Sequence, residues 1–283
     1  MNDLALVLGG GGVAGVAWIT GVVAGLADEG IDLRETQRIL GTSAGSTVGA
    51  QLWSGMSLED LFARQADPAQ QTPELSPPFS ALRTLFVAFQ EIARIADPDE
   101  RVRRISRMAL DSNVISEPER RSIIARRLPS HNWPAKWFGT TAIDAETGEL
   151  RVFDSTSGVS LVDAVAASCA VPMIWPATSI LGRRYVDGGM RSADNADLVT
   201  GAGSVLILSP SGVDAASLRG IGLRKEAADL EAKGMRVSVM EPDATARAAI
   251  GVNPLDPSTR TPCANAGRIQ GRVEAERVRA FLR

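Results

Sequence analysis

The chain has 283 residues, of which 45% are apolar and 22% are charged, and its formal net charge at pH 7 is −3. This length and apolar content suffice for a large buried core, in one α/β domain or in two smaller domains. The negative net charge argues against a nucleic-acid partner, because binding to phosphates requires a basic surface.

The few cysteines and histidines limit the chemistry further. Cys169 and Cys263 form no C-x-x-C pair, and His131 is the single histidine. We therefore expect no disulfide framework, no metal site and a reducing, cytoplasmic location. The N-terminal residues lack the basic start of a signal peptide, and no uncharged apolar run approaches the roughly 18 residues of a membrane span. These features predict a soluble protein.

The first part of the chain predicts alternating strands and helices. Residues 4–8 are a continuous apolar run closed by glycine, as in a buried parallel strand, and residues 13–29 are rich in small and apolar residues, as in a packed helix. A second short strand is expected at residues 38–41, with a helix behind it at 43–54. This order predicts a right-handed βαβ unit and a mostly parallel sheet.

Residues 57–135 differ from the rest in composition. A stretch rich in Pro, Gln and Ala at residues 67–78 predicts a loop, and the charged residues 101–127 predict two helices with a break near Asn113. Between them, four apolar residues at helical spacing predict an amphipathic helix whose stripe is either core or a lipid-facing lid: Leu82, Leu85, Phe86 and Phe89. We expect a helical insertion beside the active-site face.

The remaining elements complete the predicted sheet. Further strands are expected at residues 136–143, 150–153, 184–186, 204–208 and 235–240, and further helices at 161–170, 222–233 and 264–281. No repeat and no linker divides the chain. The sequence therefore predicts one domain over residues 1–283, with three α/β/α layers around a mostly parallel sheet of about six strands.

Residues 41–45 have the G-x-S-x-G pattern of a nucleophile elbow, a sharp strand-to-helix turn that exposes a serine hydroxyl. Gly41 and Gly45 permit the close backbone contacts of such a turn, which a Cβ would obstruct. The pattern makes Ser43 the candidate nucleophile. The N–H group of Ala44, next to it, is a candidate donor to an oxyanion.

A glycine run follows the first predicted strand. Backbone N–H groups of Gly10, Gly11 and Gly12 would form an oxyanion hole, since glycines let an acyl group approach the backbone closely. The same run fits the dinucleotide fingerprint as Gly10-x-Gly12-x-x-Gly15. That fingerprint needs an acidic residue at the end of the next strand, whereas the acids at residues 28–32 lie in or just after the predicted helix.

We expect a carboxylate to act as the base for Ser43. His131 lies in a loop-like segment before a strand, where a solvated histidine is the simpler interpretation. Asp187 follows a predicted strand and precedes Gly188 and Gly189, which would let another loop come close. Burial would raise its proton affinity and make it a usable base. The alternative for this Asp-Gly pair is an ordinary hairpin turn.

Together, the glycine loop, the G-x-S-x-G motif about 30 residues later and the late D-G-G turn resemble the patatin-like phospholipases, which use a Ser–Asp dyad. The similarity extends over about residues 4–208. It includes the segment 167–172, which is similar to the family's segment before the aspartate strand. The resemblance implies Ser43 as nucleophile, Asp187 as base and residues 10–12 as oxyanion-hole backbone.

The resemblance implies a serine hydrolase that cleaves carboxylic esters of lipids, of phospholipase A, lysophospholipase or esterase type, without a cofactor. A lipid substrate would bring peripheral contact with a membrane. The sequence departs from the family at Ala14, where a basic residue is frequent. Two alternatives stay open: a dehydrogenase-like nucleotide-binding module built on Gly10-x-Gly12-x-x-Gly15, and a lipid-binding protein with little turnover, suggested by Ala14.

Overall fold

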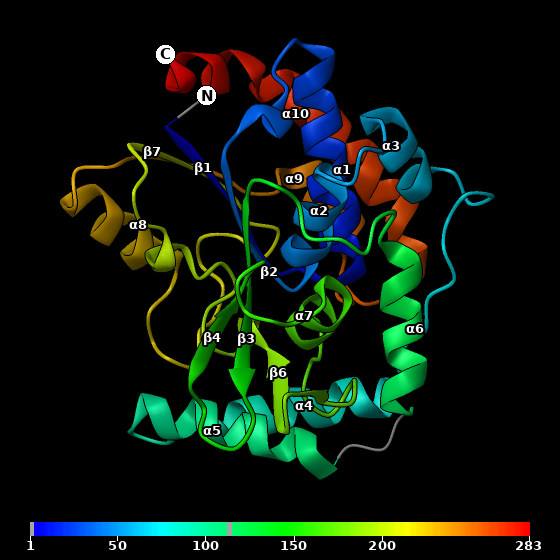
Figure 1. The fold of residues 1–283 in the computed structure, drawn as a ribbon, viewed down its shortest axis with the longest axis vertical. Helices are drawn as coiled ribbons and strands as arrows, with labels where there is room; N and C mark the ends of the chain where they lie inside the picture. The colour runs from blue at the N-terminus through cyan, green and yellow to red at the C-terminus, as the bar shows by residue number, and fades with distance from the viewer. Residues whose placement is uncertain (1–2, 112–114) are drawn as a thin grey trace.

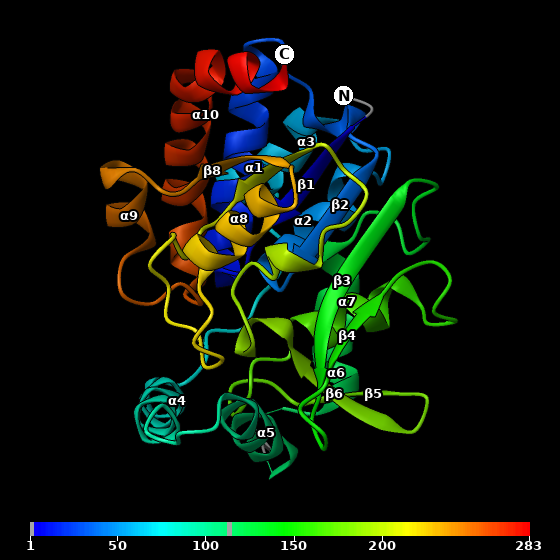
Figure 2. The same ribbon diagram turned by 90° about the vertical axis from the view of Figure 1, so that its left-hand side faces the viewer.

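The computed structural model describes residues 3–111 and 115–283, and in these residues one eight-stranded sheet is flanked by helices (Figure 1, Figure 2). The strand order is β5-β6-β3-β2-β1-β7-β8, with β4 paired to β3. The strands are β1 (Leu4–Leu8), β2 (Arg38–Thr42), β3 (Trp137–Asp144), β4 (Leu150–Phe153), β5 (Thr178–Ile180), β6 (Arg183–Asp187), β7 (Ser204–Leu208) and β8 (Arg236–Met240).

The central strands are parallel, as the sequence predicts. β1 pairs in parallel with β2 and β7, β2 with β3, and β7 with β8. The pairs of β3 with β4 and β6, and of β5 with β6, are antiparallel. Eight strands form instead of about six, and β5 was not predicted. It pairs with β6 through a tight turn at Leu181 and Gly182, whose φ angles are 50° and 77°.

The predicted helices are confirmed, with small shifts at their ends, and two helices that were not predicted form at residues 58–66 and 244–250. The helices are α1 (Gly12–Asp28), α2 (Ala44–Leu52), α3 (Leu58–Ala66), α4 (Phe79–Ile92), α5 (Pro98–Met108), α6 (Glu117–Arg127), α7 (Leu161–Ser168), α8 (Leu223–Ala232), α9 (Ala244–Ile250) and α10 (Arg260–Leu282). Short 3₁₀ helices lie at Leu33–Glu35, Ala109–Asp111, Gly188–Met190, Ala196–Leu198 and Pro257–Thr259. None of the described helices combines the length and apolar character needed to cross a bilayer.

Alternation along β1 divides the core into two layers. Leu6 and Leu8 belong to a cluster with residues of α1, α2 and α10, whereas Ala5 and Val7 belong to a cluster with residues of α8. Successive side chains of a strand point to opposite faces, so both faces of the sheet are covered. The three-layer arrangement expected from the sequence follows from this double coverage.

Helices α3 to α6 lie between α2 and β3 in the chain. α5 and α6 confirm two helices in the charged stretch, and the expected break near Asn113 falls outside the described residues. Along α4, Ala88 and Ile92 are buried, but Phe86 is 63% exposed. The core interpretation of the apolar stripe is therefore wrong for Phe86. Figure 2 shows α4 and α5 together at the end of the molecule away from the C-terminus.

α1 and α10 pack side by side along most of their length (Figure 1, Figure 2). Glycines make this possible, because the two backbones are almost in contact. A Cβ added at Gly21 would lie 2.2 Å from the Ala264 carbonyl oxygen, and one at Gly25 would lie 2.1 Å from that of Arg268. This packing fixes α1, whose first residue, Gly12, belongs to the glycine run.

The variant Gly25→Ala tests this packing. Alanine gains up to about 1 kcal/mol of helix propensity over glycine, but the overlap with the α10 backbone forces the helices apart and should lower the free energy of unfolding by about 1–3 kcal/mol net. Urea unfolding followed by circular dichroism measures this change in the free energy of unfolding. In the control Gly222→Ala the Cβ would meet only the Ala215 oxygen, at 3.8 Å, so the expected loss is limited to the poorer N-cap of α8, below about 1 kcal/mol. An unchanged midpoint for Gly25→Ala would contradict the packing argument.

Candidate active site

Ser43 occupies a one-residue turn between β2 and α2. Its backbone angles are φ 52° and ψ −111°, a conformation that a non-glycine residue rarely adopts. The flanking glycines are required by close contacts: a Cβ at Gly45 would lie 1.8 Å from the Leu8 oxygen, and one at Gly41 would lie 2.6 Å from the Ser46 backbone. This is the strand–turn–helix context that the G-x-S-x-G pattern predicts.

The last residue of α7 and the two residues after it hold both predicted catalytic residues in place. The Ser43 N–H donates to the Ser168 Oγ at 2.9 Å, and the Cys169 thiol donates to the Ser43 carbonyl at 3.3 Å. Two residues further, the Ala170 carbonyl accepts from the Asp187 N–H at 3.0 Å. Sequence reasoning did not single out Ser168 by itself. Its only signal was the likeness of segment 167–172 to a family segment.

Asp187 is the last residue of β6, and only 2% of its surface is exposed. Burial raises the pKa of this carboxyl to about 7, while the nearby Ser43 hydroxyl and the Gly189 N–H, which donates to Asp187 Oδ1 at 2.8 Å, oppose the rise. Gly188 lies against β3, where a Cβ would be 2.3 Å from the Thr141 hydroxyl. The structure therefore brings Ser43 and Asp187 together, and it gives the carboxylate the proton affinity of a base that works near neutral pH.

His131 lies apart from this pair. It is exposed, and its Nε2 is 3.0 Å from the Ala125 carbonyl oxygen. It does not line the pocket that contains Ser43. Among the described residues, no group of three or more His, Cys, Asp or Glu side chains is placed to hold a metal ion.

The glycine run lies against Ser43, but the N–H group of Gly10 already has a partner. A Cβ at Gly10 would be 3.6 Å from the Ser43 Cβ, yet the Gly10 N–H donates to the Ala193 carbonyl at 2.7 Å. The expectation that Gly10 supplies an oxyanion donor is therefore corrected, because this N–H points to a neighbouring loop. Gly15 serves packing, since a Cβ there would be 3.2 Å from that of Ala44.

Two helix N-termini converge on the same place. Gly11 is the N-cap of α1 and Gly12 its first residue, Ala44 is the first residue of α2, and no side chain caps either helix. The first N–H groups of a helix have no partner within the helix, and they carry the positive end of its dipole. Gly12 and Ala44 both line the pocket that contains Ser43. This arrangement suits a developing negative charge at the serine.

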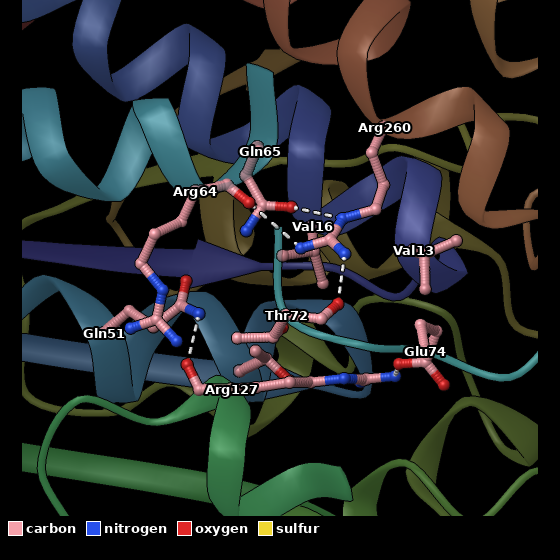
Figure 3. A pocket seen from close by; sticks show the side chains of 10 residues that line it. Val13, Val16, Gln51, Arg64, Gln65, Thr72, Glu74, Arg127 and Arg260 are labelled. Carbon is pink, nitrogen blue, oxygen red and sulfur yellow. Dashed lines mark hydrogen bonds and ion pairs between the residues drawn. The ribbon is translucent and has the colours of Figure 1, made fainter. Parts of the chain in front are cut away.

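The pocket at Ser43 is narrow, with about 20 Å³ of free volume. Its wall includes three charged side chains that sequence reasoning missed, Glu74, Arg120 and Arg127. No local pattern marks them: Glu74 lies in the stretch predicted to be a loop, and the arginines lie in a helix whose charges resemble a solvated face. A second pocket adjoins this one and shares Glu74 and Arg127 with it (Figure 3).

Comparisons with known proteins give one family and a set of distant structures. The family model described as patatin-like phospholipase matches residues 6–200. VipD from Legionella pneumophila is 13% identical, with a TM-score of 0.48, over 98% of this chain and 67% of VipD. The type III effector ExoU is 14% identical, with a TM-score of 0.42, over 98% of this chain and 53% of ExoU.

The ExoU–SpcU complex of the Pseudomonas aeruginosa type III secretion system also matches, at 15% identity and a TM-score of 0.38, over 97% of this chain and 52% of that one. The chain thus spans about half the length of ExoU. A search of curated proteins found no match.

The buried carboxyl at position 187 predicts an unusual pH dependence of stability. Because its folded pKa, about 7, exceeds the unfolded value of 3.8, the native state binds more protons between these pH values, and stability falls as pH rises through this window. At pH 8 the neutral variant Asp187→Asn should be more stable than wild type by a few kcal/mol, and this advantage should disappear toward pH 4.

Urea unfolding at both pH values measures this difference. Asp214→Asn is the control. Because the Asp214 side chain is 77% exposed, this variant should differ from wild type in stability by a similar, small amount at both pH values. If Asp187→Asn is no more stable than wild type at pH 8, ionisation of the buried Asp187 does not destabilise the folded protein as predicted.

Proposed function

The chain belongs to the patatin-like phospholipase family, and on this premise we propose that it is a serine acyl hydrolase that cleaves carboxylic ester bonds of lipids. One observation carries the proposal: the buried Asp187 carboxyl, with its pKa raised to about 7, lies near the hydroxyl of a serine in a strained strand-to-helix turn. A nucleophile next to its base is the arrangement that covalent catalysis requires.

In the proposed reaction, ionised Asp187 accepts the proton of the Ser43 hydroxyl as Oγ attacks the ester carbonyl. The alcohol leaves with a proton returned by Asp187, and a covalent acyl-enzyme remains. Asp187 then activates the water that hydrolyses this intermediate. An aspartate of ordinary pKa would be a weak base toward a serine hydroxyl, so the burial of Asp187 supports this role.

The negative charge on the tetrahedral oxygen would rest on backbone N–H groups. Gly12 and Ala44 are the proposed donors, with Gly11 beside them, since these residues begin α1 and α2 without capping side chains. Each such donor contributes on the order of 3 kcal/mol to transition-state stabilisation. Gly10 is left out because of its hydrogen bond to Ala193.

The nucleotide-binding alternative finds no support in the geometry. The strand after the glycine run, β2, ends at Thr42 and is followed by Ser43 rather than by an acid. Of the candidate acids, Asp28 pairs with Arg268 and Asp32 with Arg34. These pairs lower the pKa of both carboxyls and use the oxygens that a ribose would need.

Labelling by a serine-directed fluorophosphonate tests the dyad. Wild type should be labelled, Ser43→Ala should not, and Asp187→Asn should react about 100-fold more slowly because the general base is lost. His131→Ala is the matched control and should be labelled at the wild-type rate. Absence of labelling in folded wild type would overturn the active-hydrolase proposal, and lipid binding retained by Ser43→Ala would then favour the binding alternative.

The rate of labelling should also depend on pH. Because Asp187 must be ionised to accept a proton and its pKa is about 7, the rate should rise through this pH and be lost below it. Initial rates from acid to mildly alkaline pH, corrected for decay of the probe, measure the midpoint. A rate that stays flat across neutral pH would exclude Asp187 as the base.

A further inference from the structure

A buried ion-pair cluster lies beside Ser43 and has no part in the proposed dyad. Glu74, in the segment between α3 and α4, has a side chain that is only 3% exposed. One carboxylate oxygen accepts from Arg120 at 2.7 Å and the other accepts from Arg127. Both arginines belong to α6, and their side chains are 7% and 11% exposed. The cluster is therefore almost completely withdrawn from water.

Positive charge exceeds negative charge in this region. The Ser43 pocket contains two arginines and one glutamate, and the adjoining pocket adds Arg64 and Arg260. Figure 3 shows Arg127 extended from α6 toward Glu74, with Arg260 reaching in from α10. Buried cations without compensating charge are costly, so this region favours a further anion.

Arg260 does not use the carboxylate. Its guanidinium donates to neutral acceptors: the Gln65 side chain at 3.2 Å, the Thr72 carbonyl at 2.8 Å and the Arg64 carbonyl at 3.0 Å. These bonds hold the start of the segment that carries Glu74. Burial lowers the pKa of Arg260 to about 10, and the charge of Arg127 adds to the effect.

Arg120 retains unused capacity to bind an anion. Within the described residues its buried Nε has no hydrogen-bond partner, and its guanidinium lies over the Trp175 ring at 3.8 Å. Burial, and then repulsion by Arg127, lower its pKa to about 10, which remains far above neutral pH. Arg120 is thus a fixed cation, oriented by an aromatic ring, with a donor still available.

The pocket is closed in this structure. Its free volume of about 20 Å³ suffices for about one water molecule, not for an ester with its acyl chain. Glu74 and Leu75, from the same segment, form part of its wall. A lipid can therefore reach Ser43 only if part of this wall moves, and the segment of Glu74 and Leu75 is one such part.

We propose that Arg120 and Arg127 form a binding site for the phosphate of a phospholipid head group, and that the Glu74 carboxylate occupies this site until the substrate displaces it. The inference rests on the proposed lipid hydrolysis at Ser43 and specifies its substrate class. Two unesterified phosphate oxygens can bridge two guanidinium groups as the two carboxylate oxygens do. In a phospholipid the phosphate and the ester carbonyls are joined by a short glycerol backbone, so one pocket can hold both.

Binding of inorganic phosphate tests the anion site without catalysis. Glu74→Gln keeps the shape of the side chain but removes the internal competitor. Saturating phosphate should raise the Tm of this variant by about 2–4 °C more than that of wild type. The double variant Glu74→Gln/Arg127→Gln should lose the gain. Glu276→Gln, in an exposed pair with Arg279, is the matched control and should behave as wild type.

Hydrolysis tests whether the site serves a lipid head group. In the Glu74→Gln background, adding Arg127→Gln should lower kcat/KM for dihexanoylphosphatidylcholine at least about tenfold more than kcat/KM for dihexanoylglycerol, which has no phosphate. An equal fall for both esters would mean that Arg127 only supports the pocket. A phosphate-dependent rise in Tm with no difference between the esters would assign the site to free phosphate and overturn the head-group proposal.

Equal shifts of Tm in all variants would show that phosphate acts only by exclusion from the protein surface, and would overturn the anion site itself. The two proposals fail separately. If fluorophosphonate does not label Ser43, the hydrolase proposal fails, but the phosphate titration still decides whether Arg120 and Arg127 bind an anion.

Discussion

The candidate site depends on the close contact between α2 and β1. The Gly45 N–H donates to the Gly9 carbonyl at 3.1 Å, and there is no room for a Cβ at Gly45 beside Leu8. With the helix this near the sheet, the chain leaving β2 must reverse within one residue. As a result, the backbone of Ser43 is strained. Such a conformation typically costs about 1–3 kcal/mol and persists only where neighbouring residues hold it. Its N–H bond to Ser168 is one such restraint.

The same restraint extends to the carboxylate. Since Ser168 holds Ser43 and Ala170 holds Asp187, a shift of the short segment between them would move both side chains together. Their relative position is therefore better defined than either is alone. Burial of Asp187 gives the carboxylate its proton affinity, and it also makes the ionised state costly for the fold. Stability and the proposed chemistry oppose each other at this residue.

Much of the fold was predictable because its signals are local. β1 and β7 are continuous apolar runs, as central parallel strands are, whereas the three residues of β5 carry no such pattern. The Ser43 turn was predictable because its G-x-S-x-G pattern lies within five consecutive residues, directly after a short apolar run. The burial of Glu74 was not: its arginine partners lie 46 and 53 residues away, and only the folded chain brings them together.

Charge balance would let the cluster at Glu74 discriminate between substrates with and without a phosphate. Removing its carboxylate leaves Arg120 and Arg127 buried and unpaired, which is strongly unfavourable. If a neutral ester entered the pocket, both arginines would stay unpaired. A phosphate would restore one negative charge between the same two cations. The exchange would also leave the net charge near Ser43 almost unchanged, so the proton affinity of Asp187 would be retained as the pocket opens. A segment that closes the pocket with its own anion thereby favours substrates that bring another.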